Sequence, residues 1–168
     1  IAGRRVFPCC FGSALKLQGV DVLLSLLDTY APQKSYPDDF SAKVYKISRD
    51  PQGNRLTWLK VTGGSLKVRS VLSYKDPKGE TCDEKIVQMR SYSADKFNPV
   101  DEVFAGELTA VTGLTSTWAG QALGAEPGGL PPAMEPVMTY RVNLPKGCDP
   151  AVAMPKLRQL QEEDPQLR

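Results

Sequence analysis

Hydrophobic residues recur at helical spacing near the start of the sequence. The apolar positions between residues 20 and 30 follow an i, i+3, i+4, i+7, i+10 pattern, which places them on one face of a helix: Val20, Leu23, Leu24, Leu27 and Tyr30. The pattern predicts a helix from Val20 to Tyr30, ended by Pro32. The apolar run at residues 4–11, which stops at Gly12, is typical of a buried strand. One strand and one helix cannot close a core, so this segment is expected to pack on a larger neighbour.

Between residues 40 and 123 the pattern changes to short strands separated by turn signals. The expected strands are 40–49, 55–63, 65–74, 84–92, 99–104 and 107–113. Two intervening turns, at residues 50–53 and 76–79, share the sequence Asp-Pro-x-Gly. In such a turn Asp starts the turn, Pro fixes φ at the second position and Gly takes the fourth. Several strands with no helix between them predict a mainly β domain, either a closed barrel or a small sandwich.

The final third of the sequence begins with a segment rich in Gly and Pro, residues 126–136, which is typical of a linker. A strand is expected at residues 137–144. Asp149 is then expected to cap a last helix with Pro150 at its first position. Pro155 would remove a backbone donor inside that helix, so the alternative is a helix that begins at Met154 or Pro155.

Composition excludes several kinds of chemistry. The 168 residues include no histidine, which removes Ser-His-Asp and Cys-His catalysis and His-ligated zinc. The four cysteines form no C-x-x-C pair, so idle thiols are favoured over a zinc or redox site. No apolar run approaches the roughly 18 residues that a membrane-spanning helix needs. Carboxylate pairs without histidine or a metal framework favour solubility over acid–base catalysis.

The charge distribution is uneven although the net charge is only +2. Residues 43–75 contain eight Lys or Arg and a single acid, Asp50, whereas residues 76–107 contain four Lys or Arg and eight acids. An ordinary solvated strand face is the simpler interpretation, and contact with a polyanion is the alternative. The two tryptophans are not expected to form a stacking platform: Trp58 is expected in the core and Trp118 in a loop, with packing the favoured role of both and partner contact the alternative for Trp118.

Residues 12–16, Gly-Ser-Ala-Leu-Lys, followed by Gly19-Val20-Asp21, resemble the fifth guanine-nucleotide motif of translational GTPases. Phe40-Ser-Ala-Lys-Val-Tyr-Lys-Ile and the turn at 50–53 resemble the opening of the second domain of elongation factor G. Later stretches resemble the rest of that domain and the entry to the third, in the family's order: Glu84–Met89, Val103–Glu107, Ala110–Leu114, Glu135–Val137 and Leu157–Pro165. Pro155 departs from the family, in which a core Leu is usual at this place.

The sequence therefore resembles the elongation factor G superfamily along nearly its whole length. Within the superfamily, the linker and residues 144–149 look nearest to tetracycline-resistance ribosomal protection factors, and an elongation factor G paralogue stays open. The resemblance implies a closed translation-factor β-barrel. An N-terminal strand-helix piece of a P-loop GTPase domain and a C-terminal strand-helix piece of a ferredoxin-like domain are expected to flank it.

The domain boundaries implied are the end of the GTPase domain at 1–32, a linker at 33–39 and domain II at 40–125. A second linker at 126–136 and the start of domain III at 137–168 follow. No G-x-x-x-x-G-K-[ST] and no Asn-Lys-x-Asp motif occur in the sequence. We therefore expect this piece alone to be no enzyme and to bind no GTP appreciably, while the parent is expected to be a cytoplasmic GTPase that uses GTP and Mg²⁺.

The resemblance also implies particular contacts in the intact parent. Ser13, Ala14 and Leu15 are expected to touch guanine, and Lys16 to flank the base. The second domain of the family leans on small-subunit ribosomal RNA, which makes Lys67, Arg69 and Lys75 the candidates for phosphate contact. Other expected partners are the remainder of the GTPase domain and domain III, with no membrane and no DNA.

Two further expectations concern the chain in isolation. Exposed apolar surface on residues 4–11 and 20–30 would allow oligomers or strand exchange. The rival to a translation-factor fragment is a free-standing β-barrel module that binds an oligonucleotide or a protein. A parent reading frame with an upstream P-loop would distinguish the two.

Overall fold

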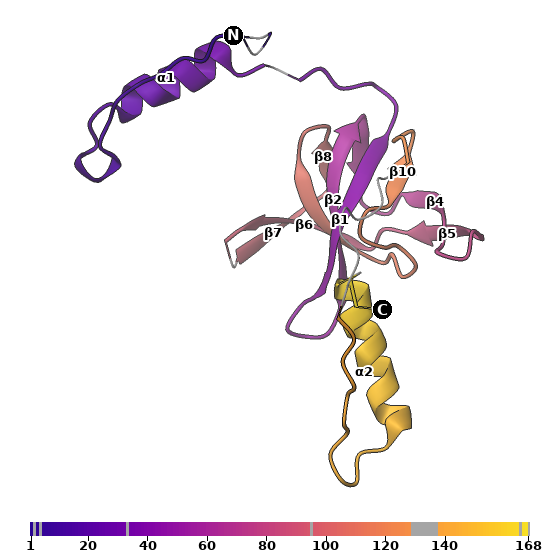
Figure 1. The fold of residues 1–168 in the computed structure, drawn as a ribbon. Coiled ribbons are helices and arrows are strands. Elements are labelled where there is room, and N and C mark those ends of the chain that lie inside the picture. The colour runs from indigo at the N-terminus through magenta and orange to yellow at the C-terminus, as the bar shows by residue number, and fades with distance from the viewer. Residues whose placement is uncertain are drawn as a thin grey trace. The chain divides into compact units, whose positions relative to one another are not determined.

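A computed structural model describes residues 1, 3, 5–32, 34–94, 96–128, 138–164 and 166–167 (Figure 1). The chain divides into two compact units, residues 1–35 and residues 36–168. In the described residues, the first unit contains a short 3-10 helix and one α-helix, and the second contains ten strands and one α-helix. No described helix is long and apolar enough to span a membrane.

The first unit consists of the 3-10 helix η1 (Ala14–Lys16) and the helix α1 (Val20–Tyr30). Helix α1 has the predicted bounds. It follows Gly19, whose φ of 73° lies in the left-handed region that glycine adopts without strain, and it ends at Ala31, where the backbone turns extended ahead of Pro32.

The predicted strand at residues 4–11 is wrong for the residues that the structure describes. Residues 5–11 carry no strand, and residue 4 lies outside the described residues. A strand needs a neighbour for its backbone hydrogen bonds. The described part of this unit supplies only an isolated bridge between Ser13 and Gln18.

The second unit is built on a six-stranded antiparallel sheet with the strand order β10-β1-β2-β9-β6-β7 (Figure 1). Its members are β1 (Ser41–Arg49), β2 (Arg55–Gly63), β6 (Gln88–Ser93), β7 (Lys96–Val100), β9 (Leu108–Thr112) and β10 (Ala122–Gly124). Two small sheets join β3 (Ser65–Lys67) to β8 (Glu102–Phe104) and β4 (Val71–Lys75) to β5 (Thr81–Lys85). The mainly β prediction is confirmed. Closure into a barrel is not, because β10 and β7 are unpaired ends of the larger sheet among the described strands.

One face of these strands encloses the core of the second unit. From Thr57 to Gly63 strand β2 alternates between buried and half-buried positions, as a half-buried sheet requires. In β1 the alternation is interrupted by a register shift between Val44 and Lys46. The largest fully buried apolar side chains come from both ends of the β-rich sequence: Val44, Ile47, Leu59, Val61, Ile86, Met89, Val111 and Leu114. Burial of such a side chain stabilises the fold by roughly 1.5–3 kcal/mol. This unit therefore closes a hydrophobic interior of its own.

The predicted strand 65–74 is two strands. β3 ends at Lys67 and β4 begins at Val71, with Arg69 between them at a φ of 67°. A non-glycine residue in this left-handed conformation cannot continue a strand. The kink lets the chain leave the sheet with β8 and enter the sheet with β5.

The predicted strands 84–92 and 99–104 are also divided where the chain changes sheets. β5 ends at Lys85 and β6 begins at Gln88. Between them, the N–H of Ile86 bonds the Ser70 carbonyl at 3.0 Å, and the N–H of Val87 bonds the Thr112 carbonyl at 2.9 Å. β10 was missed, because three residues between turns give no readable alternation.

Both predicted Asp-Pro-x-Gly turns are present. The N–H of Gly53 donates to the Asp50 carbonyl at 2.8 Å, and that of Gly79 donates to the Asp76 carbonyl at 2.9 Å. Each glycine has a positive φ, 85° and 89° respectively. The sequence chemistry of these turns thus fixes the β1–β2 and β4–β5 hairpins.

The last helix, α2, spans Pro150–Glu163. The Asp149 carboxylate accepts a bond from the Ala151 N–H at 2.8 Å, so the predicted cap is confirmed and the alternative start at Met154 or Pro155 is wrong. Pro155 lies inside the helix and removes one donor, which the cap and Pro150 at the first position offset. Residues 138–144 contain no strand, contrary to the prediction for 137–144, and residue 137 lies outside the described residues.

Candidate functional site

The loop at residues 12–19 holds the four predicted guanine-contact residues in one tight turn. The Ser13 N–H donates to the Gln18 carbonyl at 2.9 Å, and the Gln18 N–H returns a bond to the Ser13 carbonyl at 3.1 Å. The Lys16 N–H also donates to the Ser13 carbonyl, at 3.1 Å. Ala14, Leu15 and Lys16 form η1, and Leu15 is 96% exposed. The structure therefore presents Ala14 and Leu15 outward on a loop closed by backbone bonds.

Two glycines allow the ends of this loop to meet. A Cβ added at Gly12 would lie 2.7 Å from the Gln18 carbonyl oxygen, and one added at Gly19 would lie 2.5 Å from the Phe11 carbonyl oxygen. Real side chains do not tolerate such approaches. Glycine at both positions is thus required for the shape in which Ser13 and Ala14 are displayed.

The three candidate RNA-contact residues are all exposed, but they belong to different sheets. Lys67 lies in β3, Arg69 in the kink that follows, and Lys75 at the end of β4. From Val71 to Lys75 the chain rises by about 13 Å, at ~3.3 Å per strand residue. Lys67 and Arg69 are therefore near neighbours on either side of the end of β3, whereas the length of β4 separates Lys75 from them.

Antiparallel pairing cancels part of the charge contrast seen along the sequence. Lys67 is paired in register with Glu102 of β8, and its Nζ lies 3.6 Å from the Glu102 carboxylate. The Lys67 side chain is still 68% exposed, so this surface ion pair contributes little stability and leaves the ammonium accessible.

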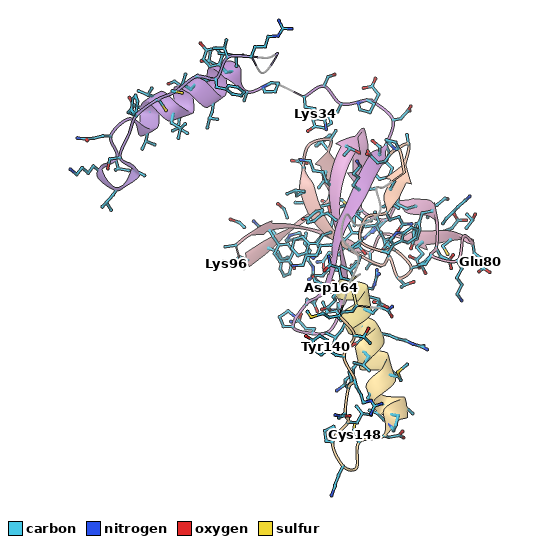
Figure 2. The ribbon with its side chains drawn as sticks, in the orientation of Figure 1. Lys34, Glu80, Lys96, Tyr140, Cys148 and Asp164 are labelled. Atoms are coloured by element: carbon cyan, nitrogen blue, oxygen red, sulfur yellow. The ribbon has the colours of Figure 1, made fainter. Side chains whose placement is uncertain are left out.

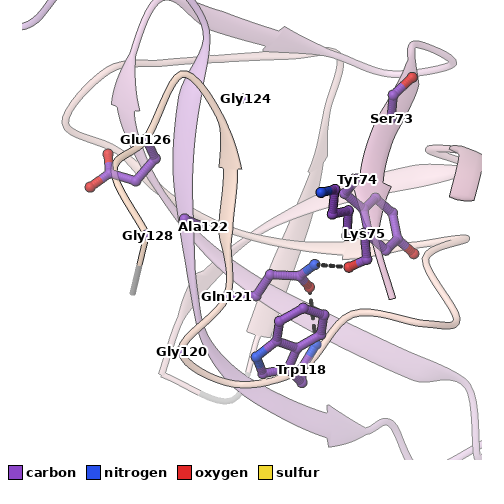
Figure 3. Close-up of a pocket in the computed structure, with 10 residues that line it drawn as sticks. All are labelled: Ser73, Tyr74, Lys75, Trp118, Gly120, Gln121, Ala122, Gly124, Glu126 and Gly128. Carbon is purple, nitrogen blue, oxygen red and sulfur yellow. Dashed lines mark hydrogen bonds between the residues drawn. The ribbon is translucent and has the colours of Figure 1, made fainter. Parts of the chain in front are cut away.

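A groove of about 410 Å³ opens between β4 and β10 (Figure 3). Gln121, which is 4% exposed, spans it by donating to the Lys75 carbonyl at 2.7 Å and accepting from the Trp118 N–H at 3.2 Å. Trp118 is 37% exposed, which is consistent with its predicted loop position. The sequence did not predict a role for Gln121, because no pattern in the adjacent residues distinguishes a buried amide side chain from an exposed one.

Two polar networks hold the loop at residues 114–118 against the sheet. The Arg55 guanidinium donates to the Leu114 carbonyl at 2.7 Å and to the Thr117 hydroxyl at 2.9 Å. The Arg55 Nε also meets the Glu162 carboxylate of α2 at 3.3 Å. Because these bonds use both ends of the guanidinium, Arg55 is a structural clamp and is not free to bind a ligand.

The second network centres on the Glu84 carboxylate. The Thr115 N–H donates to it at 2.7 Å, and the Thr115 and Tyr74 hydroxyls bond it as well. Burial opposes ionisation of Glu84, but the hydrogen bonds from Thr115 and Tyr74 outweigh burial and lower its pKa. Burial, and then Glu84 itself, raise the pKa of Tyr74. Both groups keep their ordinary charge at neutral pH, so this pair holds the loop and does not exchange protons.

Trp58 is not a core residue as predicted. Its ring lies on the face of β2 opposite Leu59 and is half-buried, with the indole N–H donating to the Ser48 hydroxyl at 2.7 Å.

In the described residues, no group of three or more Cys, Asp or Glu is placed to hold a metal ion.

Comparison with known proteins agrees with the resemblance seen in the sequence. The family model described as "Elongation factor G domain 2" matches residues 39–126. Elongation factor G 2 of Geobacter metallireducens is 30% identical over 192 aligned residues, covering 98% of this chain and 27% of the relative. Elongation factor G of Amoebophilus asiaticus is 28% identical, covering 99% of this chain and 27% of the relative.

A solved structure from Thermus thermophilus shares the fold, with a TM-score of 0.63 at 22% identity. That match covers 88% of this chain and 23% of the other. The chain thus spans about a quarter of the length of the relatives it matches. Since the family match takes in more than half of the residues, the chain belongs to the elongation factor G domain 2 family.

Proposed function

We propose that the chain is part of a GTP-binding translation factor that acts on the ribosome, in which residues 40–125 couple the GTPase domain to the small subunit. The family match over residues 39–126 is the observation that carries the proposal. The relatives' names, Elongation factor G and Elongation factor G 2, support it. GTP hydrolysis and ribosome binding are proposed for the longer protein, because this chain covers only 27% of each relative.

The proposed organisation assigns residues 1–32 to the GTPase domain and 137–168 to a third domain, with linkers at 33–39 and 126–136. The β-rich region between them is proposed to close as a barrel in the longer protein. The elements around the larger sheet are consistent with this, since β4 and β10 face each other across the groove that Gln121 spans.

The loop at residues 12–19 is proposed to contact guanine through Ser13, Ala14 and Leu15, with Lys16 beside the base. Small side chains and a backbone-closed turn would let a planar base approach the main chain closely. The groups that hold the phosphates and Mg²⁺ are expected in the remainder of the longer protein, since this sequence contains no P-loop motif.

Calorimetry of the 168-residue chain with GTP tests whether the phosphate-binding groups lie outside this chain. We expect no tight binding, because one guanine-facing loop without a phosphate cradle supplies few of the contacts. Tight binding by this chain alone would contradict the proposal.

Lys67, Arg69 and Lys75 are proposed to contact ribosomal RNA phosphates. Replacing all three with Glu in the full-length protein should weaken ribosome co-sedimentation and flatten its salt dependence. Each lost phosphate contact reduces the slope of log K against log salt by about 0.7–0.9. The replacement Lys78→Glu with Lys85→Glu, at exposed positions around the β4–β5 hairpin, is the matched control. An unchanged salt slope in the triple variant would show that the three residues take no part.

A finer placement among tetracycline-resistance ribosomal protection factors is proposed from residues 144–149. The test is protein synthesis by purified ribosomes inhibited with tetracycline, measured with and without the full-length protein. A protection factor restores synthesis, and an elongation factor paralogue does not. If the full-length protein does not restore synthesis, the protection-factor placement is wrong and the elongation factor paralogue stands.

A further inference from the structure

Four aromatic rings form a continuous row across the six-stranded sheet. The row, called here the aromatic strip, consists of Tyr45 from β1, Trp58 from β2, Tyr92 from β6 and Phe97 from β7. Ring centroids are 6.4 Å apart between Tyr45 and Trp58, 4.8 Å between Trp58 and Tyr92, and 5.5 Å between Tyr92 and Phe97. All three pairs are tilted. The Trp58–Tyr92 contact joins strands that lie far apart in the sequence, and the other two contacts lie within the β1–β2 and β6–β7 hairpins.

The aromatic strip lies on the opposite face of the sheet from the core. Tyr45 is 45% exposed and Phe97 is 42% exposed, whereas Leu59, next to Trp58 in β2, is fully buried. The single polar atom of the Trp58 ring is satisfied by Ser48, which holds the indole in place. The strip therefore offers a fixed, partly open aromatic surface.

The charge of this sheet is of one sign. Its six strands contain no Asp or Glu and seven basic residues: Lys43, Lys46, Arg49, Arg55, Lys60, Arg90 and Lys96. The two small sheets differ, since they contain three acids, Asp83, Glu84 and Glu102, against three lysines, Lys67, Lys75 and Lys85. The aromatic strip thus occupies the only described sheet without a carboxylate.

Cations also lie directly against the rings. The Lys46 Nζ is 5.8 Å from the centroid of Trp58, and the guanidinium carbon of Arg90 is 4.4 Å from that of Phe97. Asp50 neutralises Arg90 across 3.0 Å, and carboxylates outside the sheet pair with Lys43, Arg49 and Arg55. Lys46 makes no ion pair in the described residues, and Lys96 projects at the end of the β6–β7 hairpin (Figure 2).

We propose that the aromatic strip binds unpaired bases of single-stranded RNA, with Lys46 and Lys96 meeting the backbone phosphates. Exposed rings accept base stacking without regard to sequence, and lysines beside them attract the polyanion. A proline-rich peptide also docks on aromatic surfaces, but it has no need of a sheet free of carboxylates. The proposal goes beyond phosphate contact at Lys67, Arg69 and Lys75, which lie outside this sheet.

Trp58 fluorescence tests the proposal directly. The chain has two tryptophans, so Trp118→Phe leaves Trp58 as the only one. In the full chain with this substitution, a short oligouridylate should quench the emission, and an RNA duplex of the same length should quench it far less. Because one base stack changes affinity by roughly tenfold, Phe97→Ala and Tyr45→Ala should each weaken binding by about that factor.

The matched control is Phe104→Ala in β8, since Phe104 is 57% exposed but belongs to another sheet. It should leave the affinity for the oligouridylate unchanged. Equal binding of the duplex or of heparin, which has no bases, would overturn the proposal. So would a Phe97→Ala variant with unchanged affinity, or one that instead disrupts a dimer of this chain in sedimentation.

Discussion

Helix α1 and strand β2 both contain several large apolar residues, but they differ in how much of each side chain is covered. In β2, Leu59 and Val61 are fully buried. In α1, Leu24 remains 60% exposed and Leu27 remains 54% exposed, and the helix has no buried residue. The apolar stripe that predicts α1 is thus present, and no described residue of its own unit, residues 1–35, buries it.

This difference separates two sources of order. Strand β2 is held by neighbours on both sides, β1 and β9, and by the core beneath it. An isolated helix of eleven residues is marginal in water, because few backbone bonds follow a costly nucleation step. The β-rich region should therefore account for the cooperative unfolding of the chain, and α1 should contribute little to it.

The largest expected effect comes from a deletion in the core. Leu59→Ala should reduce the free energy of unfolding by roughly 2–5 kcal/mol, because the fully buried side chain leaves a cavity. Leu24→Ala in α1 should change it by less than about 0.5 kcal/mol. Urea unfolding followed by tryptophan fluorescence measures both, since Trp58 and Trp118 both lie in the second unit. Equal losses in the two variants would contradict the comparison.

The two Asp-Pro-x-Gly turns allow the next test within the β-rich region. Asp50 accepts a bond from the Asn54 N–H at 2.8 Å and pairs with Arg90 at 3.0 Å. Within the described part of the chain, the Asp76 carboxylate accepts only local backbone bonds, from Lys78 and Glu80. Asp50→Asn should therefore destabilise the fold clearly more than Asp76→Asn, since it leaves a covered guanidinium without its carboxylate. Denaturant midpoints that move equally would show that the Arg90 contact adds nothing.

The same aspartate should make stability depend on acid pH. The hydrogen bond from the Asn54 side chain and the charge of Arg90 lower the pKa of Asp50. Its contribution is therefore full at neutral pH, starts to fall near the ordinary value of about 4, and is lost below the lowered pKa. The stability gap between the wild type and Asp50→Asn should shrink as urea midpoints are measured at falling pH. A constant gap would argue against an ionised Asp50 in the fold.

The smallest effect on stability is expected at the exposed stripe of α1. Leu24→Asp together with Leu27→Asp should leave the unfolding midpoint of the β-rich region unchanged, because neither side chain is buried. If the stripe associates between chains, the double variant should lower the apparent mass in sedimentation at high concentration. A wild type that stays monomeric throughout would remove α1 as a contact surface between copies.

Much of the fold could be predicted because the relevant chemistry is local. The spacing of Leu23, Leu24 and Leu27 defines α1, and the Asp-Pro-x-Gly turns define two hairpins. Asp149 followed by Pro150 defines the start of α2. Each of these signals acts within a few residues of itself, so no knowledge of distant partners is needed.

The breaks between sheets could not be predicted for the opposite reason. Arg69 leaves the strand conformation because its N–H bonds the Ile86 carbonyl, and Asp101 separates β7 from β8 while its carbonyl accepts from Val68. Both partners are distant in the sequence. An uninterrupted apolar run looks the same whether the strand stays in one sheet or moves to another.

The candidate contact residues show the same limit. Ser13 to Lys16 lie in one turn because they are consecutive, but Lys67 and Lys75 belong to different sheets despite their similar sequence surroundings. The aromatic strip was not predicted, since Trp58 and Tyr92 meet only after β9 pairs with both β2 and β6. Alternation predicts which face a ring occupies, but the identity of the covered face depends on the whole sheet.

Native-state hydrogen exchange on the whole chain tests the central comparison most directly. The amides of β1, β2 and β9 should exchange only through global unfolding, with the largest protection in the molecule. Those of α1 should exchange with far smaller protection in the same sample. If α1 exchanged with the same free energy as β2, the helix would share the cooperative core, and the account of an independently stable β-rich region would be contradicted.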